Sequence, residues 1–532
     1  MIWHIIWRAA GPCRRNTAMK IMRPVQIFRI LVPALVLLVM AGAQAAGPWY
    51  VATNGADSNA GTSWSVPYLT ISNALTNAST GGDTIWVSNG IYTLTAMVSN
   101  PAAKKFNICA WSTNPADTVL LGPGSNETDN FRGAWMSGTG SLQGFTVTNF
   151  YYTNENTGAG VYCSAGLISN CVIAGNIMGY NAGGGVFLSG GGMIENCGII
   201  GNSIYPANYD SGGGGVAMSG SGRIRNCRIV GNRVNGSQSG AGVRAYYGSS
   251  FVIQDSVIAS NTGGSQGAAG IDMTGGLVSN CQVFANSCPN VGGIYFHAYS
   301  GYLNYARLER CVISNNVGSW YHGGCFIDRV GITNLLISQC AIVSNYCESR
   351  ENGGLGVANM VSNVRIRNCI VAYNLAPNGD NTIGGCGMEI LSTNALIENC
   401  TIVSNTTSKG AYAGLYVING VRVGNSIIYH NQHSQNTSSN VYAAADCTFS
   451  NSCTAPLSAV VGSANTDANP QFVSKDTGNF RLAANSPCIN TGMYQDWMTG
   501  AVDLEGRQRI RYGTVDMGAY ERIHSGTIYG FR

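Results

Sequence analysis

Short alternating runs of apolar and polar residues recur along the middle of the chain, and each run covers only three to six residues. The segment from Leu167 to Ile173 (Leu-Ile-Ser-Asn-Cys-Val-Ile) is one of them. A period of two over so short a run predicts a β-strand. No segment keeps a 3.6-residue period long enough to predict a solenoid helix, and a regular Leu-x-x-Leu-x-Leu ladder is absent. The pattern therefore predicts an all-β chain of many short strands.

One phrase repeats ten times between residues 170 and 431: a polar residue, Cys or Ser, a few mostly apolar residues, and Asn. Its Cys or Ser positions follow one another in steps of 25 to 31 residues: Cys171, Cys197, Cys227, Ser256, Cys281, Cys311, Cys340, Cys369, Cys400 and Ser426. Repeats of this length are typical of stacked arrays. Several short strands per unit fit one coil of a right-handed parallel β-helix. We therefore expect a single solenoid with a helical cap at its amino end and an irregular cap at its carboxyl end.

Equivalent residues of a β-helix form ladders, because neighbouring coils stack about 4.8 Å apart. We expect the repeated cysteines to form one inward ladder of free thiols, since parallel neighbours lie side by side and disulfide geometry is strict. The asparagines that close each phrase are expected to form a second inward ladder of hydrogen-bonded amides. Outside the ladder, we expect one disulfide among Cys447, Cys453 and Cys488.

Composition along the chain predicts four parts. Residues 1–45 have the features of a secretory signal: basic residues, an apolar segment from Ile30 to Met40, and the small residues Ala43-Gln44-Ala45. Residues 46–140 are expected to hold the amino-terminal cap, with a helix from Pro67 to Ala78, and the first coils. Residues 141–445 hold the repeats, and residues 446–532 form the carboxyl-terminal capping module. We expect a protein that is secreted to the extracellular space or the outer cell surface.

The charge balance excludes some partners. Only 10% of residues are charged, and the formal net charge of +4 becomes −2 without residues 1–45, which carry six basic residues and no acidic one. There is no basic stripe, so we expect no nucleic-acid partner. The apolar segment near the amino end is too short for a comfortable membrane span, so we expect no stable membrane insertion. We expect the mature chain to be a monomer.

Phrases near both ends of the chain resemble known families. The segments from Tyr50 to Gly55 and from Gly82 to Tyr92 resemble the start of secreted bacterial right-handed β-helix proteins of the pectin-lyase-like superfamily. Asn469 to Phe472, Asp503 to Arg507 and Val515 to Glu521 resemble the choice-of-anchor Q domain, although Asn490 stands where that domain would have Asp. The resemblance implies a β-helix with a trailing surface-protein domain. Members of the superfamily include polysaccharide lyases, hydrolases and adhesins, so it does not imply one activity.

Chemistry is expected where the coils differ from one another. Alignment on the Gly-rich stretches predicts an outward row, one place after an apolar residue: Phe187, Ala217, Arg244, Asp272, Tyr295, Ala358, Glu389 and Tyr416. The middle of this row has aromatic and titratable neighbours. For a carbohydrate site, we expect substrate contacts from Arg244, Tyr246, Tyr295, His297, Trp320 and Tyr321. Proton transfer, if there is any, is expected from Asp272, His322 or Asp328.

Three functions follow as hypotheses: binding of extracellular or cell-surface polysaccharide without catalysis, cleavage of a uronic polysaccharide by a lyase or glycosidase, or a purely structural surface repeat. We favour the first, because the repeats show no paired carboxylates. We interpret the similarity of His322-Gly323 and Arg365-Ile366-Arg367 to polygalacturonase motifs as chance for the same reason. No metal site or cofactor is predicted. Asp57, Asp467 and Asp503 could bind Ca²⁺, but turns use the same residues.

Overall fold

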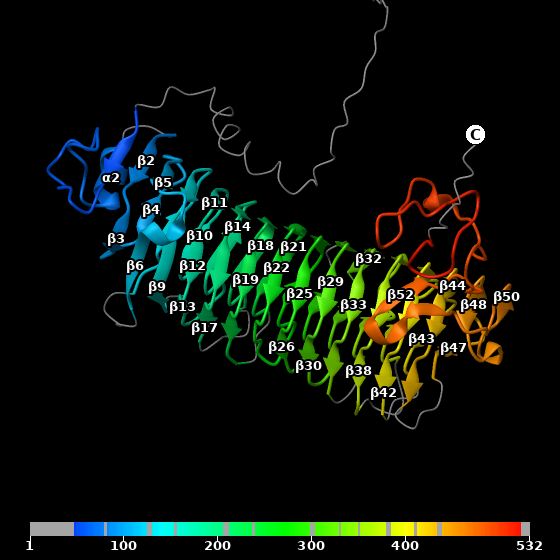
Figure 1. Cartoon of the computed structure of the whole chain (residues 1–532). Coiled ribbons are helices and arrows are strands. Elements are labelled where there is room, and N and C mark those ends of the chain that lie inside the picture. The colour runs from blue at the N-terminus through cyan, green and yellow to red at the C-terminus, as the bar shows by residue number, and fades with distance from the viewer. Residues whose placement is uncertain are drawn as a thin grey trace, which may run out of the picture. The chain divides into compact units, whose positions relative to one another are not determined.

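A computed structural model describes most of the chain after the expected signal segment. The described residues are 47–78, 82–124, 130–153, 157–205, 212–236, 240–297, 304–328, 331–348, 352–378, 385–408, 412–433 and 439–522. Residues 1–45 lie outside them. The chain divides into units 1–44 and 45–532, and the described residues all belong to the second. This second unit is a stack of coils, each made of short parallel strands (Figure 1).

A coil runs through up to four short strands, which stack on their neighbours as ribbons named here A1, A2, B and C. Ribbon A1 consists of β4 (Val98–Asn100), β7 (Ala134–Met136), β10 (Val161–Cys163), β14 (Val186–Ser189), β18 (Val216–Arg225), β21 (Val243–Gln254), β23 (Ile271–Met273), β27 (Ile294–His297), β31 (Cys325–Asp328), β35 (Leu355–Val357), β39 (Met388–Ile390), β43 (Leu415–Val417) and β47 (Val441–Ala443). Strands β18 and β21 are long enough to continue into the next ribbon.

Ribbon A2 follows A1 within each coil. It also contains β1 (Trp49–Val51), β2 (Thr84–Val87), β5 (Asn107–Ala110), β8 (Ser141–Gln143), β11 (Leu167–Ser169), β15 (Met193–Glu195), β24 (Gly276–Ser279), β28 (Asn304–Glu309), β32 (Ile332–Ser338), β36 (Val364–Arg367), β40 (Leu396–Glu398), β44 (Arg422–Gly424), β48 (Thr448–Ser450) and β50 (Gly462–Ser463). All pairings printed for A1 and A2 are parallel and join strands of neighbouring coils.

Ribbon B comes next along the coil. It consists of β3 (Gly90–Thr93), β6 (Thr118–Gly124), β9 (Thr146–Tyr152), β12 (Val172–Ala174), β16 (Gly198–Ile200), β19 (Arg228–Val230), β22 (Val257–Ala259), β25 (Gln282–Phe284), β29 (Val312–Ser314), β33 (Ala341–Val343), β37 (Ile370–Ala372), β41 (Thr401–Val403), β45 (Ile427–Tyr429) and β49 (Cys453–Thr454). The turn from A2 into B has a residue with positive φ in coil after coil, such as Asn170 (50°) and Asn280 (51°). Asn adopts this conformation more readily than most side chains, which explains its frequency before the repeated Cys.

Ribbon C closes the coil with two-residue strands. These are β13 (Ile177–Met178), β17 (Ser203–Ile204), β20 (Arg233–Val234), β26 (Ser287–Cys288), β30 (Val317–Gly318), β34 (Tyr346–Cys347), β38 (Leu375–Ala376), β42 (Thr406–Thr407) and β46 (Gln432–His433). The parallel β-helix expected from the repeat is therefore confirmed. Parallel pairing between neighbouring coils runs from β1 to β50, because both strands still pair in register with their neighbours.

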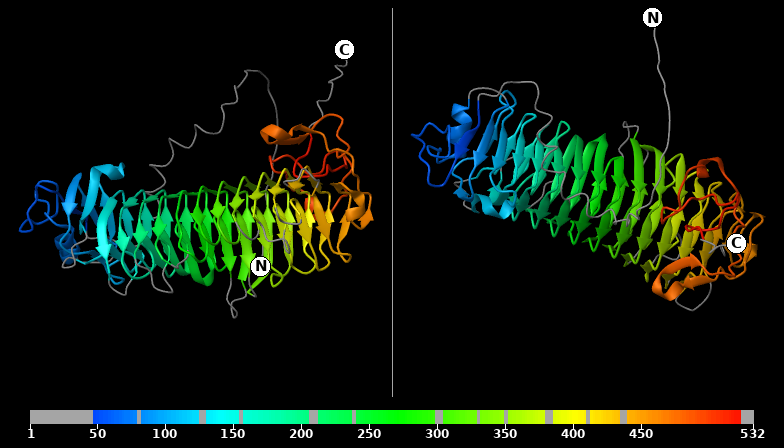
Figure 2. Two further views of the ribbon diagram at one scale, coloured as in Figure 1. Left: turned by 90° about the horizontal axis from the view of Figure 1, so that it is seen from below. Right: turned by 45° about the horizontal axis from the view of Figure 1, so that its top comes forward.

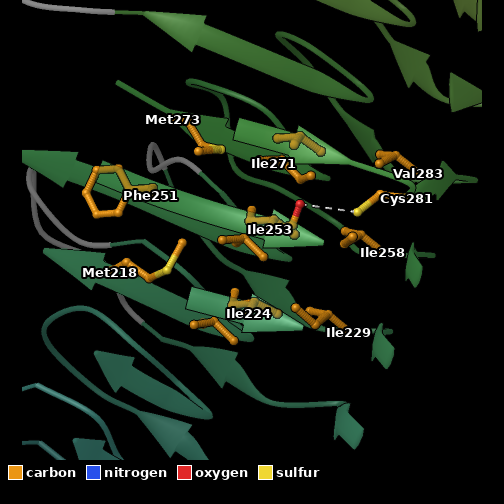
Figure 3. Packing of buried hydrophobic residues seen from close by; sticks show 14 of the residues in the cluster. Met218, Ile224, Ile229, Phe251, Ile253, Ile258, Ile271, Met273, Cys281 and Val283 are labelled. Carbon is orange, nitrogen blue, oxygen red and sulfur yellow. Dashed lines mark hydrogen bonds between the residues drawn. The ribbon is translucent and has the colours of Figure 1, made fainter. Parts of the chain in front are cut away.

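Apolar side chains from A1, A2 and B fill the interior of the coils. Figure 3 shows three neighbouring coils, in which Met218, Phe251 and Met273 come from one side of the interior and Ile258 and Val283 from the other. The repeated cysteines are free and buried, as expected: Cys171, Cys197, Cys227, Cys281, Cys311, Cys340, Cys369 and Cys400. Each thiol donates to backbone carbonyls; Cys281 Sγ lies 3.6 Å from Ile253 O.

A ladder of buried asparagines holds neighbouring coils together between ribbons B and C. Asn316 Oδ1 accepts from the backbone N–H of Asn286 at 3.1 Å and from its side-chain amide at 3.0 Å. The amide of Asn316 then donates to Val283 O at 2.9 Å and to Asn345 Oδ1 at 2.9 Å. The same pattern links Asn176, Asn202, Asn232, Asn261, Asn286, Asn316, Asn345, Asn374, Asn405 and Asn431. The expected amide ladder is confirmed, and Asn440 ends it by accepting from Asn431.

A short helix covers the amino-terminal part of the stack. Helix α2 (Ile71–Asn77) begins four residues later than the expected Pro67, because the Thr70 side chain caps it by accepting from Asn73 N. Ile71, Ala74 and Leu75 are its buried residues. The described residues also form four short 3₁₀ helices: η2 (Pro115–Asp117), η3 (Leu457–Ala459), η4 (Lys475–Thr477) and η5 (Asp496–Met498).

The carboxyl-terminal module, residues 470–522, packs along the side of the coils rather than over the open end of the stack (Figure 2). It contains the antiparallel pair β51 (Phe472–Ser474) and β52 (Asn479–Leu482). Its backbone carbonyls accept from the turn residues of five consecutive coils: Gln339, Asn368, Asn399, Asn425 and Asn451. These are the positive-φ residues between ribbons A2 and B. The module therefore binds to the row of equivalent turns that the repeat creates.

A disulfide among the three cysteines outside the ladder, as expected from sequence, is not formed in the structure. Cys447, Cys453 and Cys488 are all free and buried. Cys453 instead donates to Ala468 O at 3.2 Å. Cys453 and Cys488 belong to one apolar cluster, which joins the last coil to the module by packing.

Buried ionic groups hold the module together. Arg509 is fully buried and lies 3.3 Å from the Glu521 carboxylate, while Asp503 accepts from three backbone N–H groups. Asp516 accepts from the backbone N–H groups of Asn490 and Arg522. Burial, opposed by Arg509 and reinforced by Asp516, raises the pKa of Glu521 to about 8.

The asparagine ladder predicts that one amide controls the stability of several coils. We expect Asn316→Ala to lower the free energy of unfolding by about 3 kcal/mol, because it leaves several buried donors and acceptors without partners. Asn315→Gly, at the neighbouring exposed turn position with φ of 54°, is the matched control and should be nearly neutral. Urea unfolding followed by circular dichroism measures both. Equal effects of the two substitutions would contradict a special role for the ladder.

The raised pKa of Glu521 predicts a pH-dependent module. The folded state keeps a proton on Glu521 up to about pH 8, whereas the unfolded chain releases it near 4.5. Folding stability should therefore fall as pH rises from about 4.5 to 8, since the folded state binds more protons in this window. Glu521→Gln should flatten that dependence when urea unfolding is followed by circular dichroism. A slope that Glu521→Gln leaves unchanged would contradict the assignment.

Candidate functional site

The outward row of ribbon A1 places three of the predicted residues on consecutive coils. Arg244 of β21 is in register with Asp272 of β23, which is in register with Tyr295 of β27. The row continues through Phe326, Gly356, Glu389, Tyr416 and Tyr442. The expected placement of Arg244, Asp272 and Tyr295 side by side is therefore observed.

One position of the predicted row is wrong. Gly356, and not Ala358, stands on this row, because Val357 is the buried residue of β35 that pairs with Ile390. A steric constraint explains why a glycine stands at this position. A Cβ at Gly356 would lie 2.4 Å from Cε1 of His322, so the missing side chain leaves room for the imidazole. Phe326, which the sequence alignment overlooked, occupies the row one coil earlier.

A buried acid–base pair forms the centre of the row. His297 Nε2 lies 2.6 Å from Asp272 Oδ1, and the second carboxylate oxygen accepts from Ala268 N at 3.2 Å. The exposed fraction is 1% for Asp272 and 7% for His297. Burial alone would raise the pKa of the Asp272 carboxyl. The charge and hydrogen bond of His297, followed by the charge of Arg244, outweigh burial and hold that pKa below its ordinary value.

Stacked rings extend the row toward the carboxyl end. The ring of Tyr295 stacks on His297 with centroids 4.5 Å apart and on Phe326 at 5.5 Å. Phe326 in turn stacks on His322 at 3.9 Å, and His322 is fully buried. The Tyr295 hydroxyl donates to Asp328 Oδ2 at 3.3 Å. Because protein rings cover Tyr295, its faces are not open to a sugar, contrary to the expected stacking role.

The other predicted contacts lie nearer the surface. The guanidinium of Arg244 lies 4.9 Å from the ring centroid of the half-buried Tyr246. Trp320 and Tyr321, in the turn after β30, are 48% and 38% exposed. Asp328 is half-buried. The structure thus places Arg244, Asp272, Tyr295, His297 and His322 near one another along the coils. These side chains cover one another and do not line an open groove.

An open groove lies on the neighbouring ribbon A2, which the sequence analysis did not single out. Its volume is about 550 Å³, and it is lined by Val252, Leu277, Tyr305, Arg307, Asn334, Leu335, Leu336, Asn363, Arg365 and Arg367. The outward row through it reads Val252, Leu277, Arg307, Leu336 and Arg365, one residue per coil on β21, β24, β28, β32 and β36. Apolar side chains and guanidinium groups therefore share one surface.

Ion pairs distinguish the arginines of this groove. Arg307 lies 2.6 Å from Glu309, and Arg367 lies 2.6 Å from Glu398 and 4.4 Å from the ring of Trp497 in the carboxyl-terminal module. Arg365 is half-buried and makes no ion pair within the part of the chain that the structure describes. Its charge is therefore available to a ligand.

A sequence signal for this groove exists. The position four residues before each repeated Cys or Ser reads Leu167, Met193, Arg223, Val252, Leu277, Arg307, Leu336, Arg365, Leu396 and Arg422. From Arg307 onward the row alternates between arginine and leucine. The Arg365-Ile366-Arg367 motif, interpreted as chance from sequence, thus belongs to a periodic row when the coils are aligned on the cysteine.

Two of the three aspartates considered as calcium ligands, Asp57 and Asp503, accept hydrogen bonds from neighbouring turn and cap residues. Asp57 accepts from Leu69 N, Thr70 N and the Thr70 hydroxyl, and Asp503 accepts from Glu505 N and Arg507 N. These bonds are typical of turns and helix caps. Within the described ranges, no group of three or more His, Cys, Asp or Glu side chains could hold a metal ion. No described helix is long and apolar enough to cross a membrane.

Comparison with known proteins supports the fold. A family model, the right-handed β-helix region, matches residues 132–304 and 209–371, which agrees with the handedness predicted from the repeat. No curated protein sequence matches this chain.

Several solved structures resemble the chain. The pectate lyase Pel9A covers 91% of this chain and 98% of its own at 15% identity and a TM-score of 0.33. The catalytic domain of a family GH87 α-1,3-glucanase with tetrasaccharides covers 81% and 69% at 12% identity and a TM-score of 0.30. XylC in complex with xylose covers 90% and 99% at 9% identity and a TM-score of 0.34. Similarity at this level carries no argument about activity, since one fold hosts many functions.

The Asp272–His297 pair predicts a stabilising contribution that depends on pH. We expect Asp272→Ala to lower the free energy of unfolding by about 3 kcal/mol at pH 7, because it leaves buried His297 and Ala268 N–H without their partner. With a folded pKa below the ordinary 3.8, the carboxylate's contribution should be present above pH 3.8 and be lost as pH falls through the folded value. Chemical unfolding between pH 2.5 and 7 measures this. Asp328→Ala, at a half-buried position, is the comparison, and a larger loss there would contradict the assignment.

Proposed function

We propose that this protein is an exported β-helix that binds acidic polysaccharide along the outer face of ribbon A2 and releases it unchanged. The observation that carries the proposal is the half-buried Arg365, which lies in an open groove without an ion pair among the described residues. An arginine in such a place binds carboxylate or sulfate groups through paired N–H donors. The proposal places binding on A2 rather than on the row of Asp272.

The spacing of the arginines supports a linear polymer as the ligand. Arg307, Arg365 and Arg422 follow one another at intervals of two coils. Each interval corresponds to about 10 Å along the axis at the usual strand spacing. Leu336 and Leu396 fill the positions between them. An extended acidic chain lying along the axis would meet a guanidinium group at regular steps, while the leucines contact the apolar faces of its sugar rings.

The state of the predicted acid–base residues favours binding without turnover. General acid–base catalysis requires a group within hydrogen-bonding reach of the reacting atoms. Asp272 and His297 are buried and bonded to each other, and His322 is stacked beneath Phe326. Tyr295 and Asp328 are likewise bonded to each other. This arrangement supports a structural role for the row, and cleavage by a lyase or glycosidase remains the alternative that product detection decides.

Binding to a panel of uronic, sulfated and neutral polysaccharides tests the proposal. We expect acidic polymers to bind, with affinity that falls as salt rises, and Arg365→Gln to weaken binding about tenfold, as loss of one charge-assisted hydrogen bond of about 1.5 kcal/mol predicts. Arg228→Gln removes an exposed arginine from ribbon B and is the matched control, expected to leave affinity unchanged. Affinity chromatography and calorimetry provide the measurements.

Four outcomes would overturn this function. Equal affinity for neutral polymers would remove the role of charge. Unchanged affinity of the Arg365→Gln variant would place binding elsewhere. New reducing ends, or unsaturated product absorbing in the ultraviolet, would make the protein a hydrolase or a lyase. Absence of binding to every polymer would leave the purely structural surface repeat as the function.

Export and surface location are part of the same proposal. The basic and apolar segments of residues 1–45 and the small residues before Ala46 support cleavage there. We further propose that the mature chain is monomeric and that the carboxyl-terminal module, which forms residues 470–522 of the segment 446–532 set apart from sequence, acts as a choice-of-anchor Q-like domain. Amino-terminal sequencing of protein recovered outside the cell should give Ala46 first, whereas an intact amino terminus on cytoplasmic protein would refute export.

A further inference from the structure

The stacked row of ribbon A1 ends at its last strand with a group of three tyrosines. Tyr416 of β43 and Tyr442 of β47 are in register, and their rings stack with centroids 4.7 Å apart and planes at 12°. Tyr412 lies 4.9 Å from Tyr442 and 6.2 Å from Tyr416. Within the described residues, β47 pairs with β43 alone. In this part of the chain, no further coil therefore supplies a ring to stack on Tyr442.

A pocket of about 500 Å³ adjoins Tyr442 at the end of the row. It is lined by Tyr412, His433, Ser439, Asn440, Val441, Tyr442, Ala443, Pro456, Ser458 and Ala459. The wall that includes Pro456 and Ala459 belongs to the segment around η3, which crosses the end of ribbon A1 in place of another strand. The lining residues thus enclose a space beside Tyr442, and no side chain of the row fills this space.

The walls of this pocket are held in place by bonds already described. Asn440 ends the asparagine ladder, accepts from Asn431 N at 3.0 Å and donates to Ala455 O at 2.8 Å. Ser439 Oγ accepts from Ala413 N at 3.0 Å. These bonds fix the pocket before any ligand enters, which lowers the entropic cost of binding.

The chemistry of the lining indicates an uncharged ligand with hydroxyl groups. None of the lining residues that the structure describes is Asp, Glu, Lys or Arg. The aromatic rings of Tyr412 and Tyr442 offer apolar contact, and the tyrosine and Ser458 hydroxyls offer hydrogen bonds. Flat apolar faces with hydroxyl groups at the edge are the surface of a pyranose ring.

We propose that this pocket binds a single neutral pyranose unit, with the sugar ring seated against Tyr442 where the next ring of the row would stand. The site is separate from the arginine groove of ribbon A2, with which it shares no lining residue. It also selects a different chemical class, since an acidic sugar finds no cation in its described lining. The inference therefore stands apart from the proposed binding of acidic polysaccharide.

Titration of the full mature chain with neutral mono- and oligosaccharides, followed by saturation-transfer NMR and calorimetry, tests this site. We expect Tyr442→Ala to lower affinity at least tenfold and Tyr442→Phe to retain most of it, because the ring provides the main contact. Tyr162→Ala removes another half-buried tyrosine of ribbon A1, stacked on Phe187, and should leave affinity unchanged. Thermal unfolding checks that each variant is folded.

Distinct results separate this inference from the proposed function. Arg365→Gln should leave neutral-sugar binding intact, and Tyr442→Ala should leave binding of acidic polymer intact. No saturation transfer from any neutral sugar, or equal affinity in wild type and Tyr442→Ala, would overturn the inference. Tighter binding of a phenol than of any sugar would overturn it as well, because the pocket would then be an aromatic site.

Discussion

Hydrogen bonding between buried asparagine amides is the constraint on which the rest of this structure depends. Each amide of the ladder accepts from the asparagine of the preceding coil and donates to that of the next, as between Asn286, Asn316 and Asn345. One residue thereby satisfies backbone and side-chain groups that burial would otherwise leave without partners. A coil that shifted along its own path would break these bonds on both sides. The ladder therefore fixes the register of the coils, and the register decides which residues stand in each outward row.

The two outward rows of the same face use this register in different ways. On ribbon A1, large rings on successive coils stand close enough to stack, so Tyr295, Phe326 and His322 cover one another and Asp272 is enclosed. On ribbon A2, arginine and leucine alternate, and arginine groups two coils apart do not stack. The coil spacing thus closes one row and leaves a groove on the other, although both rows lie on one continuous sheet face.

Much of the fold could be predicted because its signals are local and periodic. The alternation of Leu167 to Ile173, the repeated Cys and the closing Asn each report one coil, and together they predicted the ladders. The candidate site was harder to predict from the sequence. Alignment on Gly-rich stretches gave Ala358 where Gly356 stands, since these stretches vary in length, and it could not show that protein rings cover Tyr295. Arg365 was judged as an isolated motif rather than by its place before Cys369. Docking of the module joins residues such as Gln339 and Asp503, 164 positions apart, and no local pattern predicts it.

The lateral position of the carboxyl-terminal module has a consequence for how this solenoid can change in length. The module contacts turn residues on five consecutive coils from Gln339 to Asn451, so its own loops are matched to the rise of those coils. An inserted or deleted coil in this stretch would displace the contact points by one coil spacing, about 4.8 Å, and separate the module from part of its support. The exposed turns at Asn196, Asn226 and Asn280 carry no module. Whole coils can therefore be gained or lost in that earlier stretch, so the outer face of ribbon A2 can be extended toward the amino end while the carboxyl end keeps a constant length.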